Sequence, residues 1–320
     1  MPKRNLSEYA LLTARGLGMG AADVIPGVSG GTIAFITGIY QELINSIKSV
    51  NKAFLLLLFS KGIPAAWKHI NGSFLLAVFS GVLISIFSLA RLISWLLLVY
   101  PKLVWAFFFG LIIASALHVG KKITNWNAGV IITLIAGTAI AAYITIATPA
   151  TTPESLWFIF LSGAIAITAM ILPGISGSFI LLLLGKYEFM LNAVKDLQIG
   201  IIVIFGIGCV IGIISFSNII SWFFNKFPSG TMALLTGFMI GSLNKLWPWK
   251  EIITYRINSA GEQVPILEKS ISPFHYEAIT GQDHMLWPVI ICMIVGFFLI
   301  FTFDVIAARK SSIQNENNNE

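Results

Sequence analysis

The sequence predicts an all-α polytopic membrane protein built from two inverted-topology repeats, each a re-entrant helical hairpin followed by three transmembrane helices. Three observations support this fold class. Hydrophobic residues make up 57 % of the 320 residues and charged residues only 11 %, whereas a soluble domain carries about 25 % charged residues. Apolar runs long enough to cross a hydrocarbon core of roughly 30 Å recur along the chain. Two Pro-Gly-rich interruptions lie at matching positions of the two halves.

Each half begins with an interrupted apolar stretch and continues with three uninterrupted ones. The uninterrupted stretches are expected to be conventional spans. They lie at about Ser73–Val99, Val104–Val119, Asn127–Thr148, Gly200–Phe224, Thr231–Trp247 and Met285–Ala308. The remaining expected segments are the first repeat, 1–150, with its re-entrant hairpin 9–47 and amphipathic linker 48–72, and the second repeat, 151–320, with its hairpin 155–191 and external loop 248–284.

Residues of the two halves match at two constant offsets, which indicates an internal duplication. The first offset joins the interrupted stretches, and the second joins the spans that follow them. The matched pairs are Pro26 with Pro173, Gly27 with Gly174, Ser29 with Ser176, Gly30 with Gly177, Gly81 with Gly208, Gly110 with Gly237, and Ser115 with Ser242.

The number of crossings in each half predicts how the halves are oriented. Three crossings is an odd number if the interrupted stretch enters and leaves on the same side, so the second half would lie upside down relative to the first. Lys and Arg are more frequent in the loops that this arrangement places with the N-terminus. Because such loops are usually cytoplasmic, we expect both termini on the cytoplasmic side of the membrane.

The interruptions are expected to end one helix and begin another. In the first, Pro-Gly-x-Ser-Gly-Gly, the Pro removes a backbone donor and each Gly costs roughly 1 kcal/mol in a helix. Ser29 or Gly30 can then cap a new helix that begins near Thr32. The alternative is a single long span with a kink. A true break within the hydrocarbon region must line a protein cavity, because lipid cannot satisfy its backbone groups.

Such a break is suited to binding an anion. The new helix points free N–H groups and roughly half a positive charge into the cavity, and glycines let an anion approach the backbone closely. Hydroxyl groups of the same segments add donors. Two such termini facing each other would form a midplane site for phosphate or carboxylate. The expected site residues are Pro26, Gly27, Ser29, Gly30, Gly31 and Thr32 in the first break and Pro173, Gly174, Ser176, Gly177 and Ser178 in the second.

Three charged residues within apolar segments are further candidates. Arg91 either neutralises an anionic headgroup or reaches back to the membrane interface. Arg15 is either a cation at the inner mouth or a lipid-facing anchor. Asp23 precedes the first break, and Met170 replaces it in the second. It either carries a proton or caps free amides of the broken helix.

Other charged residues are expected to mark the ends of spans and hairpins. His118 and Lys245 occupy equivalent positions of the two repeats, and both are expected at the membrane interface. Glu42, Lys186 and Glu188 follow the hairpins and are expected to be solvated.

With these motifs in view, the chain resembles a bacterial family, the PopT-type polyprenyl-phosphate transporters. The resemblance covers nearly the whole chain. It implies a transporter, not an enzyme, that returns undecaprenyl phosphate from the outer to the inner leaflet of the bacterial cytoplasmic membrane for cell-wall synthesis. The motifs that carry it are Gly20-Ala-Ala-Asp-Val-Ile-Pro-Gly-Val-Ser-Gly-Gly-Thr-Ile-Ala34, Gly38-Ile-Tyr40, Leu172-Pro-Gly-Ile-Ser-Gly-Ser-Phe-Ile180 and Gly185-Lys-Tyr-Glu188. The family positions matched are Asp23 and the eleven break residues named above, from Pro26 to Ser178.

Two other functions are weighed against this one. A membrane phosphatase acting on a lipid pyrophosphate would need an arginine in the loop and acidic residues beside it, but glycines follow the serines here. A transporter of a small soluble anion would use the same helix termini without needing a lipid-facing opening. No cofactor, metal or nucleic-acid partner is expected. The expected partners are a lipid phosphate and membrane lipids, with proton coupling and an oligomer both compatible with the sequence.

Overall fold

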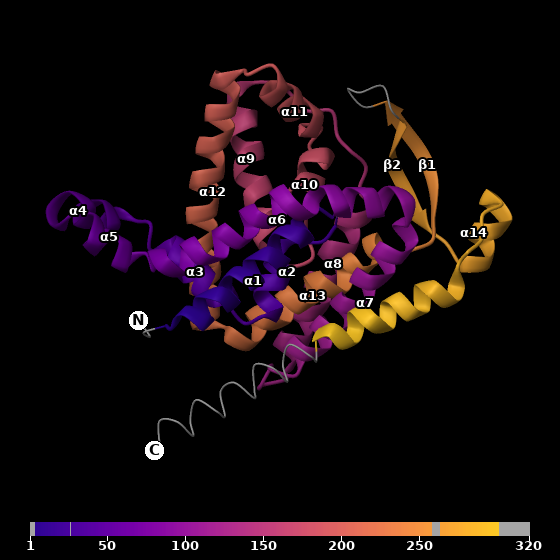
Figure 1. Cartoon of the computed structure of the whole chain (residues 1–320), viewed down its shortest axis with the longest axis horizontal. Coiled ribbons are helices and arrows are strands. Elements are labelled where there is room, and N and C mark those ends of the chain that lie inside the picture. The colour runs from indigo at the N-terminus through magenta and orange to yellow at the C-terminus, as the bar shows by residue number, and fades with distance from the viewer. Residues whose placement is uncertain (1–3, 26, 258–262, 301–320) are drawn as a thin grey trace.

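The computed structural model describes residues 4–25, 27–257 and 263–300, and the chain is mainly helical (Figure 1). The first half contains α1 (Leu6–Asp23), α2 (Gly30–Ile36), α3 (Tyr40–Lys48), α4 (Lys52–Lys61), α5 (Ile63–His69), α6 (Gly72–Val99), α7 (Pro101–Gly120) and α8 (Ala128–Ile146). The second contains α9 (Leu156–Ile171), α10 (Gly177–Leu183), α11 (Tyr187–Lys195), α12 (Ile199–Lys226), α13 (Pro228–Leu246), β1 (Lys250–Ile257), β2 (Gln263–Ser270), α14 (Pro273–Thr280) and a last helix, Leu286–Ile300.

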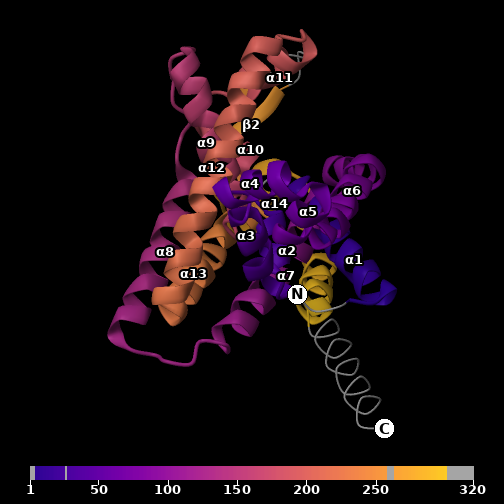
Figure 2. The ribbon, with the colours of Figure 1, turned by 90° about the vertical axis from the view of Figure 1, so that its left-hand side faces the viewer.

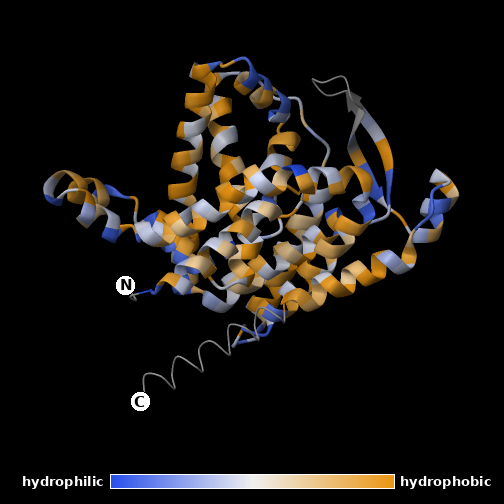
Figure 3. Ribbon diagram, in the orientation of Figure 1, coloured by the Kyte–Doolittle hydropathy of each residue, from blue (hydrophilic) through white to orange (hydrophobic). Residues whose placement is uncertain are grey.

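The long apolar helices make this chain a multi-pass membrane protein. Among the described residues, α6, α7, α8 and α12 are each long and apolar enough to cross a membrane, and up to 6 spans result if each of two bent helix pairs counts as one. Hydrophobic residues run along α12, whereas the segment carrying α14 is more hydrophilic (Figure 3). The described helices begin and end within a few residues of the spans expected from the sequence, and the expected part of the last span beyond residue 300 lies outside the described residues.

Helices at matching positions of the two halves have matching lengths. The helices α2 and α10 that follow the breaks have 7 residues each, α3 and α11 have 9 each, and α6 and α12 have 28 each. Gly27 and Gly174 share a backbone φ of +85°, a left-handed value that favours glycine. The opposite orientation of the halves across a membrane stays a prediction.

Each predicted hairpin is broken a second time. The sequence was expected to give one helix after each break, but α2 ends after two turns and α3 begins in a new direction. Gly38 and Gly185, with φ of +75° and +64°, occupy these second turns. In the second half α10 and α11 are bent by 107°. A glycine with a left-handed backbone ends a helix, because the last carbonyl groups of the helix can then accept hydrogen bonds from the turn that follows.

Backbone-to-backbone packing at glycines joins the helices in the same way in both halves. Gly81 of α6 lies against the carbonyl of Thr13 in α1, and Gly208 of α12 lies against the carbonyl of Phe160 in α9. The paired helices α9 and α12 lie side by side in Figures 1 and 2. Small residues at membrane helix contacts allow such close approach.

The third long apolar helix of each half, α8 in the first and Leu286–Ile300 in the second, packs on a helix of the other half. Gly237 of α13 lies against the carbonyl of Leu134 in α8, and Gly110 of α7 lies against the carbonyl of Met293 in the last helix. Each half therefore contributes one helix to its neighbour, which binds the two halves into one body.

The linker between the first hairpin and α6 forms α4 and α5, which project away from the rest of the chain (Figure 1). No described residue of α4 is buried. Leu55, Leu56, Phe59 and Ile63 are more than half exposed. Such a large apolar surface is typical of a helix lying at a membrane.

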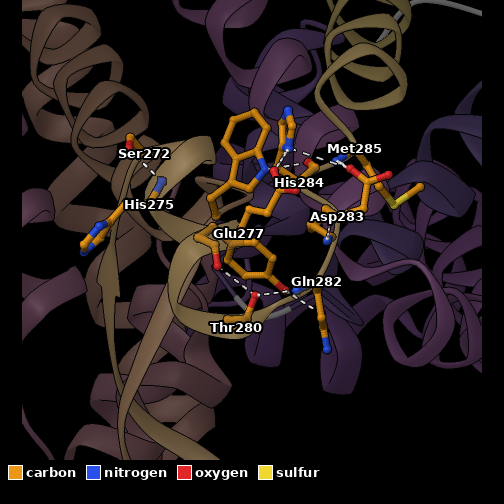
Figure 4. A network of polar contacts seen from close by, with 11 residues as sticks. Ser272, His275, Glu277, Thr280, Gln282, Asp283, His284 and Met285 are labelled. Atoms are coloured by element: carbon orange, nitrogen blue, oxygen red, sulfur yellow. Dashed lines mark hydrogen bonds and ion pairs between the residues drawn. The ribbon is translucent and has the colours of Figure 1, made fainter.

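The loop expected to be external contains the one sheet of the described residues, an antiparallel pair of β1 and β2. The all-α prediction does not include this hairpin, because apolar, aromatic and charged residues do not alternate regularly in β1 and most of its described residues are exposed. Beside the sheet, Ser272 caps α14 by accepting a 3.3 Å hydrogen bond from the backbone N–H of His275 (Figure 4). His284 contacts the Glu277 carboxylate at 2.6 Å, which ties α14 to the start of the last helix.

The glycine contacts generate a first prediction, with a matched control on the same helix. A Cβ at Gly208 would lie 2.1 Å from the Phe160 carbonyl oxygen, whereas no heavy atom lies within 4 Å of a Cβ at Gly206. Overpacking costs roughly 1–3 kcal/mol. We expect Gly208→Ala to lower the thermal unfolding temperature of the purified protein by several degrees and Gly206→Ala to leave it unchanged. Equal shifts for the two variants would contradict the packing described here.

Candidate functional site

The first break is stabilised by two side chains from its own sequence. Ser29 is the N-cap of α2 and accepts a 3.0 Å hydrogen bond from the backbone N–H of Gly31. Asp23, the last residue of α1, accepts a 2.7 Å hydrogen bond from the backbone N–H of Gly30. The predicted cap at Ser29 is confirmed, and the alternative of one kinked helix is wrong. Asp23 has the capping role, so the first free amides of α2 are already occupied.

The second break lacks this internal carboxylate. Met170 stands in the place of Asp23, and no side chain caps α10 at its N-cap residue, Ser176. The hydroxyl groups of Ser176 and Ser178 lie 2.8 Å apart, and Ser178 is exposed. The two breaks are therefore alike in backbone path but differ in charge. The start of α10 keeps polar groups available for an incoming acceptor.

The two breaks contact each other directly. The Ser29 hydroxyl donates to the backbone carbonyl of Met170, and the backbone N–H of Gly174 donates to the Thr32 hydroxyl at 2.9 Å. Ser29 and Thr32 are fully buried. These bonds cross between residues more than 140 positions apart in sequence. The first break thus satisfies two backbone groups of the second through side-chain hydroxyls, as a break inside a membrane requires.

Glycine makes this contact possible. A Cβ at Gly31 would lie 2.1 Å from the carbonyl oxygen of Ile171, a distance at which the chains would have to separate. Gly31 is therefore required for the close approach of the two breaks, whereas the left-handed turn of the first break lies at Gly27.

Lys245 of α13 lies beside both breaks, which the sequence analysis did not anticipate. Its stem contacts Gly27, since a Cβ there would lie 2.7 Å from Lys245 Cγ. Its ammonium lies 4.9 Å from the ring centroid of Phe179 in α10, a cation–π contact. Lys245 lies in the last turn of α13, as expected of a residue that ends its span, and its position at the membrane interface stays a prediction. The one signal in the sequence for its place beside the breaks is that the equivalent position in the first half, His118, also carries a nitrogen base.

Lys245 is also tied to the β1–β2 hairpin. Glu268 of β2 contacts the ammonium of Lys245 at 2.8 Å and that of Lys250 at 3.3 Å. Burial lowers the pKa of Lys250 to about 8, so its ammonium is still mostly protonated at pH 7. Two cations therefore share one carboxylate, and the cluster carries a net positive charge close to the breaks.

The remaining predicted site residues lie in different places. Pro173, Gly174 and Gly177 are buried in the second break, as are Gly27 and Gly30 in the first, and Pro26 lies outside the described residues. Arg15 is half-buried in α1, near the Arg4–Glu42 ion pair. Arg91 is exposed on α6, and within the described part of the chain no hydrogen bond or ion pair joins it to a break.

Lys186 departs from its expected solvated position. It is only 2 % exposed, its ammonium donates to the Thr152 carbonyl at 2.9 Å, and the rings of Phe158 and Phe189 flank it. A buried cation needs such acceptors and aromatic faces. It therefore fixes the turn between α10 and α11.

The fold and the paired breaks place this chain among polytopic membrane proteins in which broken helices meet inside the protein. A family model described as undecaprenyl phosphate translocase-like matches residues 19–264. The chain belongs to this family. The match covers both breaks, the whole second hairpin and most of the first.

Two curated relatives are similar over most of their lengths. A protein of Vibrio cholerae named polyprenyl-phosphate transporter is 47 % identical over 302 residues, which cover 94 % of this chain and 98 % of that protein. A protein of Staphylococcus aureus with the same name is 33 % identical over 252 residues, covering 73 % of this chain and 84 % of that protein. No solved structure matches the chain.

The contact between the breaks generates a second prediction. Thr32→Val removes the hydroxyl that accepts from the Gly174 N–H while keeping the side-chain shape, and a buried unpaired donor costs roughly 1–3 kcal/mol. We expect this variant to unfold at a lower temperature than the wild type. Thr32→Ser keeps the acceptor and should lose much less. If Thr32→Val and Thr32→Ser unfold at the same temperature, the bond between Thr32 and Gly174 does not hold the breaks together.

Proposed function

We propose that this protein transports polyprenyl phosphate, most specifically undecaprenyl phosphate, between membrane leaflets. The observation that carries the proposal is the buried meeting of two breaks, each bringing hydroxyl groups and backbone amides to one place beside a net positive cluster. Membership of a family described as undecaprenyl phosphate translocase-like, and the names of both relatives, support the choice of cargo.

The cargo explains why such a site is needed. A phosphate monoester carries about −1.5 to −2 charge at pH 7, and its bare transfer into hydrocarbon would cost tens of kcal/mol. Hydrogen-bond donors and positive charge must replace its hydration along the path. The prenyl tail needs no such help, since it can remain in an apolar environment.

Within the site, the headgroup is held mainly by the second break. Asp23 already occupies the amide of Gly30 and would repel a phosphate, whereas α10 has no side-chain cap. Ser176 and Ser178 would donate to the phosphate, and Lys245 would move from Glu268 towards it. Charge-assisted bonds of this kind are roughly twice as strong as neutral ones. Arg15 and Arg91 would then act on the lipid's approach from the membrane surface.

Transport requires the site to open to each leaflet in turn. In the proposed arrangement the halves are inverted repeats with both termini in the cytoplasm of a bacterium, and they rock about the breaks. Undecaprenyl phosphate would move from the outer to the inner leaflet of the cytoplasmic membrane and so be reused in cell-wall synthesis. One chain holds both breaks, so a single copy suffices for this step.

A lipid-pyrophosphate phosphatase is the competing function. It would need an arginine beside the transferred phosphoryl group, where this chain has Gly30 and Gly177 after the serines. Release of phosphate from undecaprenyl pyrophosphate by the purified protein would favour the enzyme. Equal transport of a soluble phosphate ester would favour a small-anion transporter.

The third prediction tests the cargo and Lys245 together. In liposomes containing undecaprenyl phosphate, we expect the wild type to move the lipid between leaflets and Lys245→Gln to do so about tenfold or more slowly, since a hydrogen bond to a charged group is worth roughly 1.5–3 kcal/mol. Lys269→Gln changes an exposed neighbour of Glu268 and is the matched control. No movement by the wild type would refute the proposed function, whereas equal rates for both variants would remove Lys245 from it.

The fourth prediction tests proton coupling at Asp23. Asn keeps an oxygen that can accept from Gly30, so Asp23→Asn removes the charge and retains the cap. If protonation of this carboxyl group biases transport, the wild-type rate will depend on pH and the variant's rate will not. The measurement is the initial rate in liposomes across a series of pH values. An Asn variant with the wild-type pH profile would leave Asp23 with its capping role alone.

A further inference from the structure

Two apolar grooves lie on the surface of the helical body, one in each half. The first has a volume of about 330 Å³ and the second about 570 Å³. The first is formed where α6 meets α7, and the second where α12 meets α13, with α8 along one side. Exposed Tyr100 and Phe227 stand at their edges.

The grooves are built from equivalent residues. Each described lining residue of the first groove has its repeat partner in the lining of the second, at the offsets already seen for the breaks and spans. The pairs are Ile25 with Leu172, Ile93 with Ile220, Leu96 with Phe223, Tyr100 with Phe227, Leu103 with Gly230, Val104 with Thr231, Phe107 with Leu234, and Phe108 with Leu235. A groove that recurs residue by residue is a feature of the repeat rather than a local packing defect.

Each groove ends at a break. Ile25 and Leu172 are the residues directly before the prolines of the first and second breaks, and both line their grooves. Each groove therefore reaches the residue that precedes a polar turn where the phosphate is proposed to bind. An amphipathic ligand with a charged end and a long apolar end matches this order of surfaces.

We propose that each groove holds the first isoprene units of the prenyl tail while the phosphate sits at the breaks. This inference rests on the proposed function, and it assigns a tail site to each half. Sites of roughly 300–1,000 Å³ enclose drug-sized ligands, so a groove takes only the part of a long tail nearest the phosphate. The rest of the tail stays in the membrane.

Two apolar grooves fit a transporter of a lipid better than a transporter of a soluble anion. Under the proposed inverted arrangement, the first groove opens at the α6–α7 connection on the outer side and the second at the α12–α13 connection on the inner side. The tail would leave one groove and enter the other as the phosphate passes between the breaks. A soluble phosphate has no use for an apolar groove at either opening.

The second groove is larger because residues of α8, such as Val130 and Thr133, also line it, and because one repeat pair differs in size. Leu103 fills space in the first groove where the second has Gly230, and a Cβ at Gly230 would have its nearest neighbours at 3.9 Å. A side chain can therefore be added there without displacing the backbone. Gly206 of α12 is also open but does not line either groove, which makes it a matched control.

The test compares the wild type, Gly230→Phe and Gly206→Phe in liposomes, with undecaprenyl phosphate as cargo and farnesol, a prenyl chain without phosphate, as inhibitor. We expect Gly230→Phe to transport about tenfold more slowly, the scale on which hydrophobic pockets respond to bulk, and to lose inhibition by farnesol. Gly206→Phe should match the wild type in both. Gly230→Leu, which copies Leu103, replaces Phe if that variant does not fold and should give a smaller effect of the same kind.

The outcomes separate this inference from the function beneath it. If the wild type moves undecaprenyl phosphate but Gly230→Phe behaves like Gly206→Phe, the groove does not hold the tail and the transport function stands. If farnesol and dodecanol, an unbranched alcohol, inhibit the wild type equally, the groove takes any lipid chain and the assignment to prenyl tails is overturned. If the wild type moves no undecaprenyl phosphate, the proposed function itself fails.

Discussion

The structure depends on one constraint: a helix broken inside a membrane protein must have its free backbone groups satisfied by protein. Here the first break satisfies backbone groups of the second, through the Ser29 hydroxyl at the Met170 carbonyl and the Thr32 hydroxyl at the Gly174 amide. Neither bond could form if the breaks were separated or only one were present. The duplication is therefore a physical requirement of this site as well as a record of its origin. The exchange of the third helices between halves holds the breaks in contact.

The same constraint explains why the site is closed yet suited to an anion. A hydrogen-bond donor in this buried contact can turn to a charged acceptor when one arrives, because its hydrogen bond to a charged group is stronger than its bond to a neutral one. Lys245 stands next to this contact and is held by Glu268. The β1–β2 hairpin is thus connected to the breaks through one ion pair. A phosphate that draws Lys245 away from Glu268 would loosen the hairpin at the same moment.

Local features of this structure could be predicted from the sequence, and contacts between distant segments could not. The break at Ser29 follows from Pro, Gly and a capping hydroxyl within six residues, and the helix boundaries follow from apolar runs. The second turns at Gly38 and Gly185 were overlooked because a lone glycine in an apolar run is compatible with a helix. The position of Lys245 depends on how α13 packs and on a carboxylate from a strand that weak alternation did not reveal. Arg91 shows the same limit, because periodicity alone does not say which face of α6 meets the protein.

The departures from repeat symmetry are where direction can arise. A carrier with two identical halves has inward-open and outward-open states of equal energy, so its own structure favours neither. This chain differs between halves at the positions nearest the proposed cargo. At equivalent positions of the two repeats, Asp23 corresponds to Met170, His118 to Lys245, and Leu103 to Gly230. Asp23 and Lys245 lie at the breaks, and the pair of Leu103 and Gly230 changes the space for the tail. Each difference gives the two states a different affinity for a prenyl phosphate. Net movement towards one leaflet still requires a lipid gradient or a coupled ion, and an ionisable group that stands in one half alone, such as Asp23, would offer a place for that coupling.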